Sequence, residues 1–101
     1  MIVKPGTRLR SVACTTEVVV VKAGGEDRVL TCGGHALAAD EGAARDAALA
    51  ADAAGGTILG KRYTDEGATI ELLCTSAGAG TLALDGVPLQ IKAAKPLPSS
   101  D

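Results

Sequence analysis

Four side chains in the first third of the chain could act together on a metal ion or a redox partner: Cys14, Glu17, Cys32 and His35. Thiolates are nucleophiles and soft metal ligands, and imidazole and carboxylate groups complete many zinc and iron sites. A tetrahedral site needs four such donors that converge on one point. These four residue types could hold iron or zinc only if the fold brings them to one point.

The surrounding sequence does not favour catalysis. His35, the only histidine, follows a Gly-Gly pair and has no acid or serine pattern beside it, so a turn histidine is the simpler interpretation. The glycines of residues 78–80 precede no Lys-Ser or Lys-Thr pair, so they do not predict a phosphate-binding loop. We expect the chain not to be an enzyme and to carry no cofactor, unless the cysteines hold iron or zinc.

Charge and composition exclude several classes of partner. Ten basic and twelve acidic residues give a net charge of -2, which leaves no strong positive field for nucleic acid or anionic lipid. No apolar run is long enough for a transmembrane helix, and the first ten residues contain no apolar signal segment. Three cysteines, an odd number, are typical of a reducing compartment. We expect a cytoplasmic protein that binds neither nucleic acid nor membrane.

The chain contains an internal repeat. Residues 6–25 match residues 60–79 at an offset of 54, and residues 28–37 match residues 80–89 at an offset of 52. The identical pairs are Gly6/Gly60, Arg8/Arg62, Thr15/Thr69, Glu17/Glu71, Ala23/Ala77, Gly24/Gly78, Leu30/Leu82, Gly34/Gly86 and Leu37/Leu89. Because these matches fall on Gly, Arg, Glu and Leu as well as on Ala, we infer a duplicated module.

Each copy is expected to form a β-hairpin. In the first, the β-branched residues 16–22 form one strand, residues 23–27 turn and residues 28–32 return. In the second, residues 69–75 and 81–84 form the strands. The Asp85-Gly86 pair then favours a type I′ turn, and residues 87–92 form a further strand that Pro88 places at an edge. The unbroken valines 18–21 indicate burial on both faces or against a second module.

The segments around the two copies are simpler. Residues 38–56 are rich in Ala and Gly, and we expect a linker with a short helix that Asp40 could cap. The predicted organisation is a first module over 1–37, this linker, a second module over 57–94 and a flexible tail over 95–101. Arg8 and Arg62 repeat together with Glu17 and Glu71, so an Arg–Glu pair is expected within each module.

The first copy resembles the desulforedoxin-like module, which also occurs at the N-terminus of desulfoferrodoxins. The matching segments are Cys14-Thr-Thr-Glu17, VVVVKAGGEDRVL and Thr31-Cys32-Gly-Gly-His35-Ala-Leu. That family holds iron through a Cys-x-x-Cys pair and an adjacent Cys-Cys pair. The resemblance implies two tandem desulforedoxin/rubredoxin-like modules, which pair as an intrachain pseudo-dimer of the mainly β class.

The ligand positions depart from the family. The first copy keeps Cys14 and Cys32 but has Glu17 and Thr31 at the inner positions. The second copy aligns Ala68, Glu71, Ala83 and Leu84 with the four ligand positions, and Cys74 aligns with Val20 on a strand, as a buried apolar residue would.

Three interpretations of the first copy stay open. It could hold a metal through Cys14, Cys32, Glu17 and His35. Cys14 and Cys32 could instead form a disulfide, because the resembled fold places them close together. Both thiols could also be vestigial and buried. A catalytic thiol at Cys32 would need a nearby base, and His35 is the only candidate.

The absence of Trp and Phe leaves the core short of large apolar side chains, so assembly with another chain is expected. We expect a small accessory or structural subunit that binds a larger bacterial protein, such as an enzyme complex, with a homo-oligomer as a further option. The alternative function is electron transfer or redox sensing with iron or zinc at Cys14 and Cys32.

Overall fold

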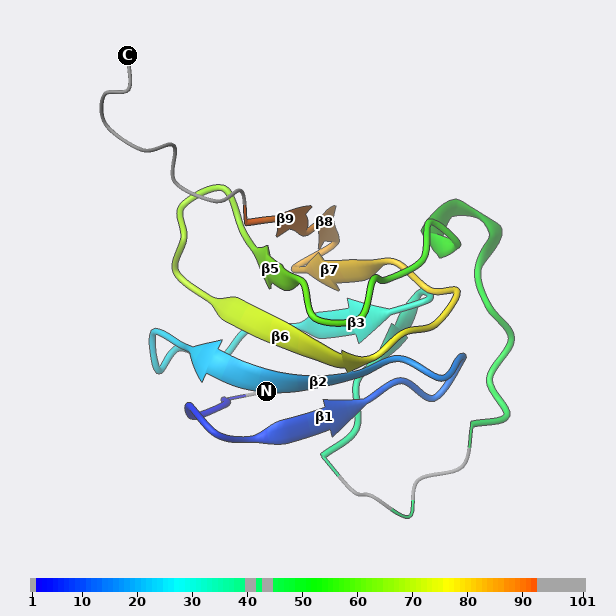
Figure 1. Ribbon diagram of the computed structural model, residues 1–101, viewed down its shortest axis with the longest axis horizontal. Coiled ribbons are helices and arrows are strands. Elements are labelled where there is room, and N and C mark those ends of the chain that lie inside the picture. The colour runs from blue at the N-terminus through cyan, green and yellow to red at the C-terminus, as the bar shows by residue number, and fades with distance from the viewer. Residues whose placement is uncertain (1, 40–41, 43–44, 93–101) are drawn as a thin grey trace.

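The computed structural model describes residues 2–39, 42 and 45–92, and these form short antiparallel strands joined by tight turns (Figure 1). The strands are β1 (Arg8–Arg10), β2 (Glu17–Lys22), β3 (Leu30–Cys32), β4 (His35–Ala36), β5 (Arg62–Thr64), β6 (Glu71–Ser76), β7 (Leu82–Leu84), β8 (Val87–Pro88) and β9 (Gln90–Ile91). A single 3-10 turn, η1, covers Ala51–Ala53. The expected mainly β class is confirmed. Within the described residues, no helix is long and apolar enough to cross a membrane.

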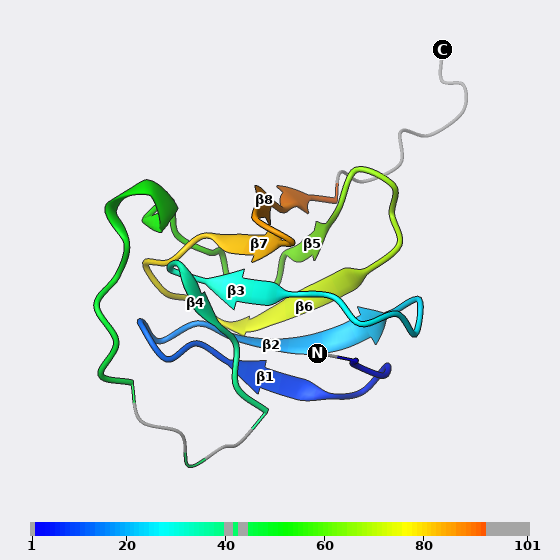
Figure 2. The ribbon, with the colours of Figure 1, turned by 180° about the vertical axis from the view of Figure 1, so that it is seen from behind.

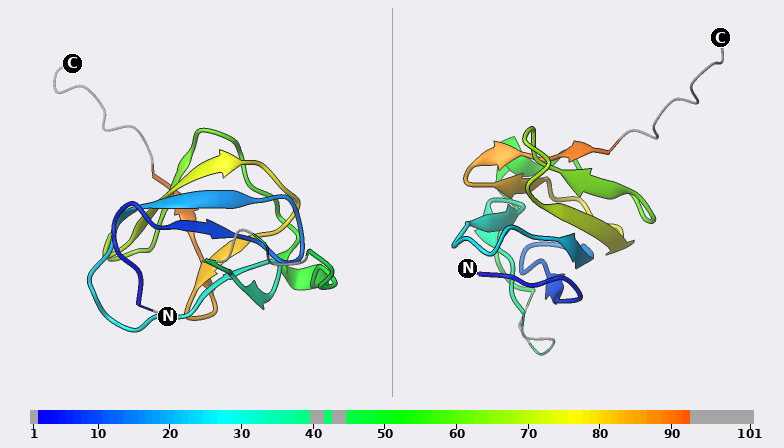
Figure 3. Two further views of the ribbon diagram at one scale, coloured as in Figure 1. Left: turned by 90° about the horizontal axis from the view of Figure 1, so that it is seen from below. Right: turned by 90° about the vertical axis from the view of Figure 1, so that its left-hand side faces the viewer.

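The strands form two sheets that pack face to face (Figures 1 and 3). The five-stranded sheet has the order β1-β2-β6-β5-β9, and the four-stranded sheet has the order β4-β3-β7-β8. The core between them is built from aliphatic side chains, two cysteines and one tyrosine: Val3, Leu9, Val18, Val20, Leu30, Cys32, Leu37, Tyr63, Ile70, Leu72, Cys74, Leu82, Leu84 and Leu89.

The valine run of β2 is buried on one face only. Val18 and Val20 are 1% exposed, whereas Val19 is half-buried and Val21 is 39% exposed. Successive side chains of a strand point to opposite faces, and only one face of this sheet meets the other sheet. Burial on both faces is therefore excluded, and the expected alternative of one covered face holds.

The strand registers repeat between the two halves of the chain. Arg8 lies opposite Val19 in the β1–β2 pair, and Arg62 lies opposite Leu73 in the β5–β6 pair, so both members differ by 54 residues. At the centre of the five-stranded sheet, Val19 lies opposite Leu73, its own counterpart.

In the four-stranded sheet, repeat counterparts also lie opposite each other, here with the offset of 52. Thr31 of β3 lies opposite its counterpart Ala83 of β7. Each half therefore contributes strands to both sheets, and a single core is shared between them (Figure 2).

The turn after β7 confirms one local prediction and corrects another. Asp85 and Gly86 have φ angles of 50° and 84°, as a type I′ turn requires, and Pro88 lies on β8, at the edge of its sheet. The single strand predicted over residues 87–92 is instead two strands in different sheets. Leu89 separates them, because its side chain is buried in the core.

The segment between the halves follows the surface and touches the end of the fold near Cys14 and Cys32. Ala47 N donates to Val12 O at 3.0 Å, Ala50 N donates to Gly33 O at 2.9 Å and Thr81 N donates to Ala53 O at 2.7 Å. The 3-10 turn lies within the predicted linker. The proposed Asp40 cap, residues 93–94 of the second module and the tail over 95–101 lie outside the described residues.

Candidate functional site: a cysteine pair under a glycine loop

The structure brings Cys14 and Cys32 together at one end of the molecule. Cys14 lies in the turn between β1 and β2, and Cys32 is the last residue of β3 in the opposite sheet. Their Sγ atoms are 3.8 Å apart. Cys32 is fully buried, whereas Cys14 is only partly buried. The pair thus spans the two sheets, and Cys14 is its more exposed member.

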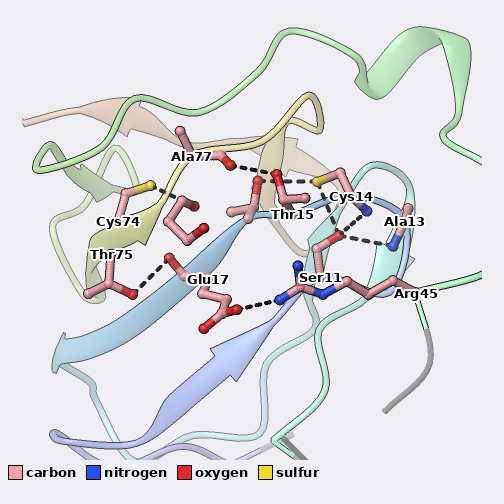
Figure 4. A network of polar contacts seen from close by, with 11 residues as sticks. Ser11, Ala13, Cys14, Thr15, Glu17, Arg45, Cys74, Thr75 and Ala77 are labelled. Atoms are coloured by element: carbon pink, nitrogen blue, oxygen red, sulfur yellow. Dashed lines mark hydrogen bonds and ion pairs between the residues drawn. The ribbon is translucent and has the colours of Figure 1, made fainter. Parts of the chain in front are cut away.

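Ser11 shapes the turn that presents Cys14 (Figure 4). Its Oγ accepts the backbone N–H groups of Ala13 and Cys14, each at 3.1 Å, and its own N–H donates to Thr16 O at 2.9 Å. Ser11 and Thr16 are both fully buried. Since Ser11 Oγ already accepts two hydrogen bonds, its hydroxyl hydrogen is left to be donated.

That hydrogen can point at sulfur, because Cys14 Sγ lies 3.3 Å from Ser11 Oγ and 3.1 Å from Thr16 Oγ1. Thr16 Oγ1 is in turn 2.9 Å from Thr57 Oγ1, and Thr57 Oγ1 accepts the Gly78 N–H at 2.9 Å. Three hydroxyl groups, two from the turn around Cys14 and one from Thr57 in the second half, therefore lie in one network around the Cys14 sulfur.

The two thiols have different pKa values because of their surroundings. Burial alone would raise the pKa of Cys14, but hydrogen bonds from the side chains of Ser11 and Thr16 and from the backbone of Thr16 and Gly80 outweigh it and lower the pKa to about 6. Burial raises the pKa of Cys32 to about 11, and the negative charge of Cys14 adds to the rise. At neutral pH the site therefore holds one thiolate and one thiol.

A glycine loop from the second half covers the pair. A Cβ atom on Gly78 would lie 2.4 Å from Thr16 Oγ1 and 3.0 Å from Cys14 Sγ. A Cβ on Gly80 would lie 2.8 Å from Gly33 N and 2.9 Å from Cys32 Sγ. Only glycine fits these two positions, which lets backbone amides approach the sulfur atoms directly.

The other two predicted ligands do not join the cysteines. The Glu17 carboxylate forms an ion pair with Arg45, and His35 Nε2 is hydrogen-bonded to Ala48 O at 2.7 Å. Within the described residues, no group of three or more His, Cys, Asp or Glu side chains could hold a metal ion. Two sulfur atoms alone do not fit a four-coordinate iron or zinc ion. Of the four predicted ligands, the structure therefore brings Cys14 and Cys32 together, while Glu17 and His35 contact Arg45 and Ala48.

The expected Arg–Glu pairs are present in one half only. Arg62 Nη1 lies 3.3 Å from Glu71 Oε2, and Lys92 Nζ lies 2.8 Å from Glu71 Oε1. In the first half Glu17 pairs with Arg45, and no ion pair between Arg8 and Glu17 occurs among the described residues. The prediction is thus confirmed for Arg62 and wrong for Arg8, because the linker supplies a competing cation.

Cys74 lies apart from the pair, as expected for a buried apolar residue on a strand. It is 1% exposed, and its thiol donates to Ser76 O at 3.3 Å (Figure 4).

Sequence reasoning found the two cysteines but missed the residues that tune them. Ser11 and Thr16 flank Cys14 within five residues, and a Ser three positions before a Cys is a local signal for a hydroxyl-capped turn. Thr57 and the Gly78–Gly80 loop reach the site only through the pairing of the two halves, so no local signal identifies them.

No protein-family model, no curated protein and no solved structure matches this chain.

Proposed function

We propose that this chain is a small non-catalytic accessory subunit that binds a larger protein, and that its scaffold is an intrachain pseudo-dimer of two hairpin modules. The repeated strand registers support the pseudo-dimer, since Val19 faces Leu73 and Thr31 faces Ala83 at the centres of the two sheets. In this proposal a shared apolar core stabilises the fold, as a bound metal does in the resembled family.

The observation that carries the interaction proposal is an apolar edge in the second half. Ile58 and Leu59, just before β5, are 52% and 63% exposed, and Ile91, which lies opposite Tyr63 in the β5–β9 pair, is 42% exposed. The offsets of the repeat place Lys4, Pro5 and Ala39 at the equivalent positions of the first half. One half therefore exposes large aliphatic side chains where the other exposes polar or small ones.

This difference at equivalent positions supports a binding surface at the edge of the second half, although the first half exposes Ile2, Val21 and Val29 elsewhere. Exposed aliphatic side chains that lie close together are typical of the buried centre of a protein–protein interface. β9 is the last strand of its sheet, so its outer side is also suited to pairing with a strand of a partner. The partner we propose presents an apolar surface, as a subunit of an enzyme complex does where a small subunit attaches.

The test is co-purification from the native host of the tagged chain and two charge variants. Ile58→Asp/Leu59→Asp changes the apolar edge, and Lys4→Asp/Pro5→Asp is the matched change in the first half. We expect wild type and the second variant to co-elute with one protein at a fixed ratio in size-exclusion chromatography, and the first variant to elute without it. Unchanged melting temperatures for both variants verify that folding is intact.

Two results would overturn this function. One is equal retention of the partner by both variants, which would place binding elsewhere. The other is a purified wild-type chain that elutes as a dimer which Ile58→Asp/Leu59→Asp dissociates, because the edge would then serve self-association.

A further inference from the structure

We propose that Cys14 and Cys32 form a reversible dithiol–disulfide site, in which Cys14 attacks a small-molecule disulfide and Cys32 resolves the resulting mixed disulfide. This inference does not depend on the accessory role. It rests on the separation of the two sulfur atoms, on their unequal exposure and on the donors that surround one of them.

The geometry suits an intramolecular disulfide. A disulfide has an S–S length of about 2.05 Å, so the sulfur atoms, now 3.8 Å apart, would need to approach by about 1.8 Å. Cys14 lies in a turn, where a small movement of the side chain does not disturb a strand. The third cysteine is excluded from this exchange, because Cys74 is buried and its thiol is bonded to Ser76 O.

The order of attack follows from exposure and from the hydrogen bonds. Cys14 is the partly exposed residue of the pair, and Ser11 Oγ and Thr16 Oγ1, at 3.3 Å and 3.1 Å, can both donate to its thiolate. Cys32 is fully buried and is a thiol at neutral pH, so it cannot meet the oxidant first. The nucleophile in a thiol–disulfide exchange is the thiolate, which assigns the first step to Cys14.

The reaction balances in two steps. The Cys14 thiolate attacks one sulfur of a disulfide RS–SR, forming Cys14–S–SR and releasing RS⁻. Cys32 then loses its proton and attacks Cys14 Sγ, which forms the Cys14–Cys32 bond and releases the second RS⁻. The Cys14 thiolate and the Cys32 thiol together lose two electrons, and one RS–SR is reduced to RS⁻ and to RSH, which takes the proton from Cys32. Once Cys14 is capped its negative charge is gone, which removes one of the causes that keep Cys32 protonated.

The test exposes the full chain to glutathione disulfide and follows intact mass. We expect wild type to lose two hydrogens, to retain no glutathione adduct and to recover its mass with a reductant. Cys32→Ser should accumulate a stable mixed disulfide on Cys14, and Cys32→Ala should do the same if the serine variant folds poorly. Cys14→Ser should react at least tenfold more slowly. Cys74→Ser is the matched control and should behave as wild type.

The pH dependence distinguishes a chemical role for the network from a structural one. We expect the rate of adduct formation in Cys32→Ala to rise with pH to a plateau, with its midpoint near the pKa of Cys14, about 6. A persistent adduct on wild type, a disulfide that includes Cys74, or equal reactivity of Cys14→Ser would overturn the proposal. None of these results bears on partner binding at the apolar edge.

Discussion

At the end of β3 the first half of the chain buries a thiol, Cys32, whereas at the equivalent end of β7 the second half buries Leu84. The position equivalent to Cys14 is Ala68, whose φ is 55°. Where Gly80 and Gly33 pack closely in the first site, the second has Arg28 and Asp85, joined by an ion pair of 2.6 Å. The same strand pairing thus occurs in both halves, but it places a thiol pair at one end and an apolar residue with an ion pair at the other.

The comparison separates what the fold needs from what the site needs. Leu84, 3% exposed, fills the position equivalent to Cys32 by apolar packing, so this strand end requires no sulfur to form. The turn near Ala68 is capped from the position equivalent to Ser11, because the Asp65 carboxylate accepts the Thr69 N–H at 2.7 Å and the Ile70 N–H at 3.1 Å. A Cβ on Gly24, the counterpart of Gly78, would meet only Thr69 O at 3.9 Å. The close contacts to sulfur, rather than the capped turn itself, are therefore specific to the thiol pair.

The largest expected change in stability comes from truncating Leu84, and the matched truncation of Cys32 compares the equivalent ends of β7 and β3. Leu84→Ala should lower the free energy of unfolding by about 3 kcal/mol, because it removes a buried leucine and leaves a cavity. Cys32→Ala removes a much smaller group and should cost about 1 kcal/mol. Urea denaturation of reduced proteins measures both changes. Equal losses would mean that Cys32 supports the fold as strongly as Leu84 does.

A smaller effect is expected from the glycines of the two equivalent turns. Gly78→Ala should destabilise the protein by about 1–3 kcal/mol, because its Cβ would lie 2.4 Å from Thr16 Oγ1. Gly24→Ala is the matched change, and its nearest neighbour would be Thr69 O at 3.9 Å. That variant should be neutral or more stable by up to about 1 kcal/mol, since alanine restricts the unfolded chain.

Thermal melts of the two alanine variants in reducing buffer check this difference. A Gly24→Ala variant as unstable as Gly78→Ala would show that the glycine loop is not packed more tightly over the cysteine pair than over its counterpart.

The sequence supports the scaffold better than the site. The identities at fixed offsets reveal the repeat, and the structure adds that counterparts such as Val19 and Leu73 lie opposite each other within one sheet. Register of this kind is set by hydrophobic alternation along each strand. The Asp85-Gly86 turn follows from local conformational preference alone. By contrast, the ion pair of Glu17 with Arg45 depends on where a segment of low complexity crosses the surface, and no periodic pattern encodes that path.

For the site, the sequence predicts the two cysteines but not the groups that surround them. The resemblance placed Cys14 close to Cys32, and the sulfur atoms are indeed adjacent. Thr57 and Gly78 reach Cys14 only through the long-range pairing of the two halves, and their contribution appears once side chains are in place. His35, a residue type suited to metal binding, is hydrogen-bonded to the Ala48 carbonyl, a contact with a low-complexity segment that the sequence does not reveal.

A further prediction concerns the pKa of Cys14, which depends on hydroxyl groups that contact its sulfur. In wild type, alkylation of Cys14 by iodoacetamide should have its pH midpoint near 6, and Ser11→Ala should move it towards the ordinary value of 9.0. Since the folded pKa is lowered, the contribution of Cys14 to stability is fully present above about pH 9 and lost as pH falls through 6. Ser11→Ala should therefore lose more stability at pH 9 than at pH 5.

Rates of alkylation with pH, and chemical denaturation at both pH values, measure these changes. Cys74→Ser again serves as the background. An unchanged midpoint in Ser11→Ala would mean that this hydroxyl does not stabilise the thiolate.

The smallest effect concerns the arginines that repeat between the halves. Arg62→Ala should lower the free energy of unfolding by about 0.5 kcal/mol, because Arg62 pairs with Glu71 but is itself exposed to solvent, which weakens the pair. Lys92 and Arg62 lower the pKa of Glu71, so this contribution is present above the ordinary glutamate pKa and is lost as the pH falls. Arg8→Ala, the matched change, should have a smaller effect because Arg8 does not pair with Glu17. Differential scanning calorimetry at pH 7 and at pH 3 compares the two variants, and a loss for Arg62→Ala that is equal at both pH values would show that its role is packing rather than charge.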